Sequence, residues 1–174
     1  MIEVRRLNAA EARHSLDALG EVLADCVEGG ASVSFMAPFP KSAAAAFFEK
    51  LLPDVERGDR ILLAAFDGSK LIGTVQVITA TPPNQPHRGD IAKLLVTRSA
   101  RGQGVAALLM QRAEKYAKEA GKSLLVLDTV TGGDAERLYQ RLGWTKVGVI
   151  PNYALFPDGR FCDTTVFWKA LIER

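Results

Sequence analysis

The stretch from Ile91 to Gly143 constrains the fold of this 174-residue chain more than any other part. It holds two short apolar runs, IAKLLV and SLLVLD, and between them a segment whose apolar residues recur at helical spacing. Short apolar runs bounded by turn residues are typical of buried strands, whereas recurrence every three or four residues is typical of a helix. A second helical pattern, AERLYQRLG, follows. The stretch therefore predicts a βαβα unit and places the chain among α/β (α+β) proteins.

A glycine-containing loop leads into the first helix of this unit. Its residues are Arg101, Gly102, Gln103, Gly104, Val105 and Ala106. The first turn of a helix has unpaired N–H groups and the positive end of the helix dipole, and both favour an anionic ligand. Glycine lets such a ligand reach the backbone, and Arg101 adds a forked donor. We expect the loop to hold a nucleotide pyrophosphate.

The same loop also satisfies a dinucleotide-binding fingerprint. Gly102, Gly104 and Ala107 give G-x-G-x-x-A, and Asp128 follows where a ribose-binding acid would stand. Two observations count against this alternative. Residues 97–101 separate the strand from the first glycine, and strand-like segments precede the unit, which normally opens a doubly wound fold. The length also fits one domain, residues 1–174, better than two.

The remainder of the chain predicts a mixture of strands and helices. Before the unit we expect a strand, a helix, a loop, a second helix begun by Ser42 and ended near Pro53, and two strands joined by Asp67-Gly68. These elements cover Ile2 to Leu7, Ala9 to Val27, Ala43 to Leu52, Arg60 to Phe66 and Lys70 to Ile78. The breaker-rich segment 81–89 is expected to connect to the strand ending at Val96, and two strands to flank the turn Pro157-Asp158-Gly159.

Two motifs in this order resemble the GNAT N-acetyltransferase superfamily. They are R-x-x-G-x-A at Arg101 to Ala106, separated from Val96 by four residues, and A-x-x-L-Y-x-x-L-G-W at Ala135 to Trp144. The resemblance implies a mixed, splayed central sheet flanked by helices, with acetyl-CoA as the cofactor between two central parallel strands. It implies cofactor contacts from the loop 101–106 and from Leu94, Leu95, Val96, Ala135 and Tyr139. One departure is Gly132, where the family often has asparagine.

Acetyl transfer to an amine by direct attack in a ternary complex needs a base, a site for the oxyanion and an acid for the thiolate. The resemblance assigns the acid to Tyr139 and the oxyanion to a backbone amide near Leu95 or Val96. Asp90 and Asp128 are both candidates for the base. The structural alternatives are a buried aromatic at Tyr139, a solvated carboxylate at Asp90, and a turn cap at Asp128.

The acceptor side is predicted from the loop between the first two helices. Phe35, Met36 and Phe39 are expected to form an apolar lid, and Asn152, Tyr153 and Asp128 to complete the pocket for the acceptor. Further motifs resemble acetyltransferases that confer tabtoxin resistance. These are D-C-V-x-G-G-A-S-V at 25–33, L-D-T at 127–129, P-x-Y at 151–153 and P-D-G at 157–159.

This likeness implies a small-molecule amine acceptor, such as a β-lactam toxin, an antibiotic or an amino-acid-like metabolite. Two alternatives remain open at this point. One is a protein or peptide N-acetyltransferase with the same catalysis, and the other is a noncatalytic sensor that binds acyl-CoA.

Composition agrees with a cytoplasmic enzyme, because 48% of residues are hydrophobic, 24% are charged and no apolar run approaches bilayer length. The first ten residues lack the apolar core of a secretion signal. The formal charge of +2 is scattered, which argues against nucleic acid and is compatible with coenzyme A. Two histidines and two cysteines show no metal-ligand spacing, so we expect no metal. Edge strands of the last hairpin leave room for a homodimer.

Overall fold

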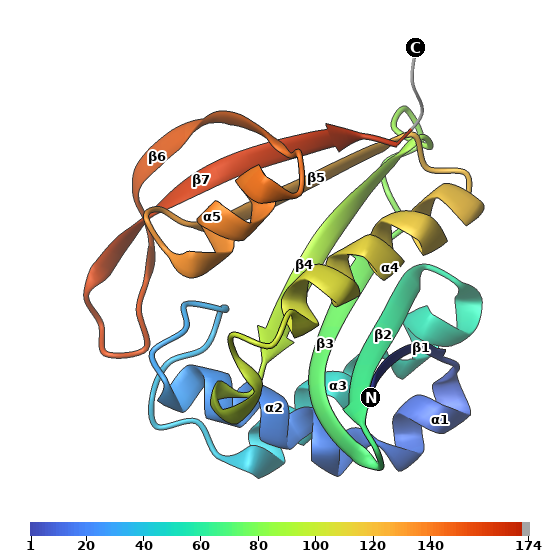
Figure 1. Cartoon of the computed structure of the whole chain (residues 1–174), viewed down its shortest axis with the longest axis vertical. Coiled ribbons are helices and arrows are strands. Elements are labelled where there is room, and N and C mark those ends of the chain that lie inside the picture. Colours follow the sequence, from blue (N-terminus) through green and yellow to red (C-terminus); the bar gives the residue numbers. More distant parts are fainter. Residues whose placement is uncertain (172–174) are drawn as a thin grey trace.

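The structure, a computed structural model, describes residues 1–171 and has a seven-stranded mixed sheet at its centre (Figure 1). The strand order is β1-β2-β3-β4-β5-β7-β6. The strands are β1 (Ile2–Leu7), β2 (Arg60–Asp67), β3 (Lys70–Ile78), β4 (Arg88–Val96), β5 (Leu124–Val130), β6 (Thr145–Leu155) and β7 (Phe161–Ala170). The helices are α1 (Ala9–His14), α2 (Leu16–Glu28), α3 (Lys41–Arg57), α4 (Val105–Glu119) and α5 (Asp134–Arg141), with a 3₁₀ turn η1 (Arg98–Ala100). The expected mixed α/β fold with a splayed sheet is confirmed.

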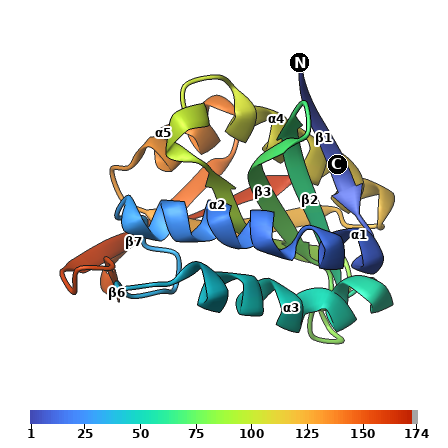
Figure 2. The same cartoon turned by 90° about the horizontal axis from the view of Figure 1, so that it is seen from below.

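The sheet separates two hydrophobic cores. Strand β2 is buried on both faces, because Ile61, Leu63 and Ala65 pack toward α4 while the alternate residues pack toward α2 and α3. Figure 2 shows α2 and α3 lying together on one face, with α4 on the other. The two helices approach closely at Gly20, where a Cβ would lie 2.8 Å from the backbone nitrogen of Ala45. Glycine at this position lets α2 rest on α3.

The centre of the sheet opens between its only two parallel neighbours among the described strands. Strands β4 and β5 pair at three positions, from Arg88 opposite Leu124 to Asp90 opposite Val126. Beyond Asp90, β4 continues beside β3 as far as Val96, and β5 continues beside β7 as far as Val130. The sheet therefore splits into two wings, which Figure 1 shows diverging like a V.

A β-bulge interrupts β4 inside this opening. Ala92 lies opposite Gln76 and Leu95 opposite Thr74, so three residue steps along β4 match two along β3. Lys93, at the bulge, has a φ of +51°. As a result Ile91 packs in the core under α4, and Leu95, four residues later, packs in the core under α2 and α3. In a regular strand these two residues would face the same side.

Polar contacts fasten the two wings at both ends of the opening. Near the paired end, Lys169 of β7 donates to Glu114 of α4 (2.8 Å) and to the carbonyl of Leu142 (2.7 Å). Beyond the open end, the loop after α2 meets the β6–β7 hairpin. There the Ser32 hydroxyl donates to the Leu155 carbonyl at 2.7 Å, and the Ala37 N–H donates to the Pro157 carbonyl at 3.0 Å.

The strand predictions agree closely with the structure, and β1 and β3 have the expected bounds. The prediction of one helix from Ala9 to Val27 is wrong, because the helix breaks at Ser15 into α1 and α2. The Ser15 hydroxyl donates to the Glu11 carbonyl at 2.9 Å, a local bond that competes with regular helix geometry. Asn8 and Glu11 form a capping box that starts α1 separately.

The second predicted helix is longer than expected at both ends. It begins at Lys41 after Pro40, with no side-chain cap from Ser42, and it passes through Pro53 to end at Gly58 in the left-handed conformation. Proline leaves the carbonyl four residues earlier without its helix partner, and that residue, Glu49, is exposed to water. Burial of Leu52 and Val55 keeps the last turns packed on the sheet. None of the helices within residues 1–171 has the length and apolar composition needed to cross a bilayer.

Candidate active site

A cavity of about 1220 Å³ occupies the opening between the two wings. The loop after α2, strand β4 and the start of α4 line one side, and β5, α5 and the β6–β7 hairpin line the other. Most of the residues singled out from the sequence line it. They are Phe35, Met36, Leu94, Leu95, Val96, Arg101, Gly102, Gly104, Val105, Ala106, Asp128, Ala135, Tyr139 and Tyr153.

The loop before α4, which was predicted to form an anion cradle, has two glycines in the left-handed conformation. Gly102 and Gly104 have φ values of +75° and +79°, in the left-handed region that favours glycine. A Cβ at either position would meet no atom within 4 Å, so backbone conformation rather than crowding requires these glycines. The side chain of Gln103 donates to the Ser99 carbonyl at 3.3 Å, and Gln103 does not line the cavity described here.

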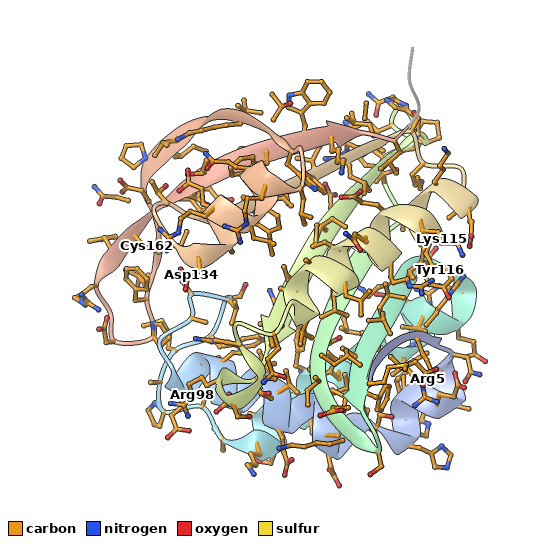
Figure 3. All side chains as sticks on the ribbon, viewed as in Figure 1. Arg5, Arg98, Lys115, Tyr116, Asp134 and Cys162 are labelled. Atoms are coloured by element: carbon orange, nitrogen blue, oxygen red, sulfur yellow. The ribbon has the colours of Figure 1, made fainter. Side chains whose placement is uncertain are left out.

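The cradle is tied to the end of α2. Arg98 in η1 donates from its backbone N–H (2.8 Å) and its guanidinium (2.9 Å) to the Asp25 carboxylate, and it also contacts Glu28. Figure 3 shows Arg98 beside α2. Gly29 leaves room for the Arg98 stem, because a Cβ there would lie 2.8 Å from its Cδ. The cradle is thus fixed by contacts made outside the cavity.

Tyr139 lies in the cavity wall and in the core at once. Its ring packs beside Trp144 and Phe167, with centroid distances of 6.0 and 5.9 Å, and only 4% of its surface is exposed. Burial, and then the negative charge of Asp128, raise the pKa of the Tyr139 phenol far above its usual value. The phenol therefore keeps its proton at any physiological pH. A buried aromatic in the core and the predicted acid for the thiolate are therefore compatible descriptions of Tyr139.

The two candidate bases occupy different places. Asp128 lines the cavity, and its carboxylate accepts a hydrogen bond of 3.1 Å from Thr164 on β7 instead of capping the turn after β5. Asp90 lies at the paired end of β4 and β5 and accepts 2.9 Å from the Arg88 guanidinium. Within residues 1–171, Asp90 is not among the residues that line the cavity.

The three apolar residues of the predicted lid differ in position. Phe35 and Met36 line the cavity, while Phe39 stacks behind Phe35 with ring centroids 4.4 Å apart and lies outside the described lining. Phe47 of α3 meets Phe35 edge-on at 5.2 Å. Phe39 therefore supports the lid rather than facing the space beneath it.

The last hairpin contributes Tyr153 to the cavity but not the side chain of Asn152. Asn152 has a φ of +52° at an irregularity in β6, and its backbone N–H donates to Asp163 at 2.8 Å. Asp163 itself lines the cavity. Within residues 1–171, Asn152 is not among the residues that line the cavity, and it orients the Asp163 carboxylate instead.

Lys93 was missed by the sequence reasoning and lines the cavity. Its ammonium donates to the Ser34 hydroxyl at 3.0 Å and lies 5.9 Å from the ring centroids of Phe35 and Phe47. Burial lowers the pKa of Lys93, and Asp128 partly opposes the shift. The signal was a lysine inside the apolar run IAKLLV, which by strand alternation would be aimed into a core.

The cavity has the features that coenzyme A requires. Arg101, Arg137 and Arg141 line its α4–α5 side, next to the unpaired N–H groups at the start of α4. Beyond Asp90, β4 has no partner on the β5 side, so its backbone is free to meet an extended arm. The residues present therefore fit a polyanionic nucleotide joined to a narrow chain.

Comparison with known proteins decides the family, since a family model described as acetyltransferase (GNAT) family matches residues 30–144. The chain belongs to this family. Membership confirms the expected class of enzyme, an acyltransferase, and the expected cofactor, acetyl-CoA. The matched residues include the cradle, both parallel strands and Tyr139.

The curated relatives match part of this GNAT chain. N-alpha-acetyltransferase MAK3 of Arabidopsis thaliana is 34% identical over 97 residues, which is 55% of this chain and 50% of the relative. The chain thus spans about half the length of that relative.

Solved structures match the fold along nearly the whole chain. An N-acetyltransferase from Staphylococcus aureus Mu50 has a TM-score of 0.81 at 21% identity and covers 99% of both chains. A putative acetyltransferase from Salmonella typhimurium, yncA, solved with its cofactor acetyl-CoA, has a TM-score of 0.80 at 18% identity, covering 99% of this chain and 95% of its own.

At Gly132, where the GNAT family often has asparagine, this chain makes a contact of a different kind. Gly132 has a φ of +78°, and its N–H donates to the carboxylate of Glu136 in the first turn of α5. Glu136 is 7% exposed and also pairs with Lys146 at 3.3 Å. The hydrogen bond from Gly132, followed by Lys146, lowers the pKa of Glu136. A side chain of α5 thus holds the turn between β5 and α5.

We predict that Glu136→Gln lowers the free energy of unfolding by about 1 kcal/mol at pH 7, because charge-assisted hydrogen bonds are the stronger kind. The pKa of Glu136 is lowered on folding, so its charge stabilises the protein above the ordinary value of 4.5. That contribution is lost as pH falls from 4.5 through the folded-state pKa. Urea titrations of both proteins at pH 7 and at steps below 4.5 measure the difference.

The matched control is Glu119→Gln, which removes an exposed carboxylate paired with Lys115 on α4 and should change stability little. A gap between wild type and Glu136→Gln that stays constant from pH 7 into the acid range would contradict the assigned role of the charge.

Proposed function

We propose that this GNAT protein transfers the acetyl group of acetyl-CoA to the amine of a small molecule, by direct attack in a ternary complex. The observation that carries the proposal is one cavity that joins an anion cradle at α4 to a carboxylate, Asp128, and a buried phenol, Tyr139. The tabtoxin-resistance likeness supports an amino-acid-like metabolite, β-lactam toxin or antibiotic as the acceptor.

Acetyl-CoA, when bound, supplies an acetyl group activated as a thioester. The cradle at 101–106 and the arginines beside α5 would hold its phosphates, and Leu94, Leu95, Val96 and Ala135 would line its narrow arm. Backbone N–H groups of β4 near Leu95 and Val96 would donate to the acetyl oxygen, as they lie where β5 has departed. These groups bind and orient, and they exclude water from the thioester.

The side chains would divide the proton transfers. Asp128 would accept a proton from the acceptor ammonium, because its carboxylate lines the cavity. Asp90 is held by Arg88 outside the described lining, so we assign it a structural role at the paired end of the sheet. Tyr139 would give its proton to the departing sulfur, because its protonated phenol lies in the cavity wall.

The acceptor is proposed to be small because the lid is tied down. Hydrogen bonds from Ser32 and Ala37 join the α2–α3 loop to the β6–β7 hairpin across the open end of the wings. An extended peptide would have to pass through this connection. The second candidate is peptide N-terminal acetylation, which the name of the Arabidopsis relative favours.

Thiol release from acetyl-CoA, measured against small amines and peptides, separates these candidates. The small-amine panel contains amino acids and tabtoxinine-β-lactam. Turnover of small amines alone supports the proposal, and turnover of peptides alone supports the second candidate. Binding of acetyl-CoA without release for any amine would favour a noncatalytic sensor.

We predict that Tyr139→Phe lowers kcat by about 100-fold or more, because it removes a positioned acid. The ring keeps its packing, so the affinity for acetyl-CoA should change less than about threefold. Steady-state kinetics and calorimetric titration measure the two quantities. The control is Tyr116→Phe on α4, outside the described cavity lining, and an equal loss in both variants would argue against a specific acid.

Asp128→Asn should reduce kcat by about 100-fold or more without a large change in thermal stability, since a positioned base is lost. Asp90→Asn is the matched comparison and should lower the melting temperature through loss of its pairing with Arg88 while retaining most activity. Kinetics and thermal unfolding of both variants test the assignment. The reverse pattern would move the base to Asp90.

Gly104→Ala should weaken acetyl-CoA binding at least tenfold, because alanine disfavours the φ of +79° that begins α4. Gly68→Ala places the same residue at a φ of +59° in the β2–β3 turn and is the control for strain away from the cavity. Both variants should lose about 1 kcal/mol of stability. Calorimetry would contradict the cradle if both variants bound acetyl-CoA equally.

A further inference from the structure

The bulge in β4 turns a lysine into the acceptor side of the cavity. In an unbulged strand Lys93 would face the same side as Ile91, which packs in the core under α4. The extra residue and the φ of +51° direct the Lys93 ammonium instead toward Ser34, Phe35 and Phe47 on the α2–α3 side. The bulge and the strained backbone of Lys93 together place a cation beside the lid.

The surroundings of Lys93 leave much of its hydrogen-bonding capacity open. An ammonium has three donors, and the structure describes one hydrogen bond, to the Ser34 hydroxyl at 3.0 Å. Ser34 also has a left-handed φ, +82°, in the loop that carries the lid. Both residues line the cavity, so the remaining donors of the ammonium can meet a ligand there.

The acceptor end of the cavity therefore carries both signs of charge. Asp128, on the facing wing, lies near enough to Lys93 to affect its pKa, yet the described contacts include no direct ion pair between them. A simple cationic amine would bring a second positive charge toward a partly desolvated lysine. An acceptor that carries its own anion would neutralise Lys93 while its ammonium meets Asp128.

We infer that the acceptor is a zwitterion, an amino-acid-like amine whose carboxylate binds the Lys93 ammonium and the Ser34 hydroxyl while its amine lies at Asp128. This inference rests on the proposed function and names the acceptor class of the same site. Lys93 is a specificity-determining residue, because it reads the anionic group of the acceptor and takes no part in the proton transfers.

Matched pairs of amino acids and their carboxamides test the inference, because the members of a pair are nearly equal in size and only the acid carries a negative charge. Wild type should acetylate the acids with a higher kcat/KM than the amides. Lys93→Gln should reduce kcat/KM for the acids at least tenfold, mostly through KM, and change that for the amides less than about threefold. Lys93→Met keeps the apolar stem against Phe35 and should give the same pattern.

Lys115→Gln is the matched control, since it removes an exposed lysine on α4 far from the cavity lining and should leave both substrates unaffected. An equal effect of Lys93→Gln on acids and amides, or a wild-type preference for the amides, would overturn the inference. Thermal unfolding of each variant checks that the fold is retained.

Calorimetric titration in the presence of coenzyme A separates this inference from the proposed function. If no amine in the panel is turned over, small-amine transfer fails, but binding still decides the role of Lys93. Wild-type binding of amino acids over their amides, lost in Lys93→Met, supports an anion subsite. Equal binding of both members of each pair, or no binding of any acid, overturns it.

Discussion

The early end of pairing between β4 and β5 is the constraint on which the rest of the structure depends. Hydrogen bonds join these parallel strands at three positions only, and each strand then follows its own antiparallel partner. The gap exposes backbone groups that a sheet would normally pair, and a ligand with a narrow polar arm can form hydrogen bonds with these groups in place of a strand. Gly102 and Gly104 of the loop before α4, Tyr139 and Asp128 all line the cavity in this gap.

The bulge in β4 gives the gap its chemical asymmetry. It keeps Ile91 in the core under α4, moves Leu95 into the core under α2 and α3, and directs the Lys93 ammonium toward Ser34 and Phe35. The cavity therefore has two chemically different sides. The side beside α4 suits phosphates, and the other side carries a lysine and carboxylates. The same backbone irregularity thus serves packing and recognition together.

Much of the fold followed from local patterns, because strands and glycine turns obey short-range rules. The cradle glycines, Tyr139 and Asp128 were predictable from motif spacing, and all line the cavity. The break at Ser15, which follows a local hydrogen bond to Glu11, was not predicted. The passage of α3 through Pro53 was not predicted either, since burial of Leu52 and Val55 outweighs local preference there. Lys93 was missed because a bulge changes which face a residue occupies, and that depends on the neighbouring strand.

The contacts that fasten the wings include one outside the cavity, between Lys169 and Glu114, and one between Ser32 and Leu155, which both line it. Glu114 and Lys169 join α4 to β7 near the paired end, and Ser32 joins the lid loop to Leu155 beyond the open end. Contacts at both ends of the opening therefore hold the angle between the two wings. A change to the Glu114–Lys169 contact can therefore widen or narrow the cavity while leaving each of its lining side chains unchanged.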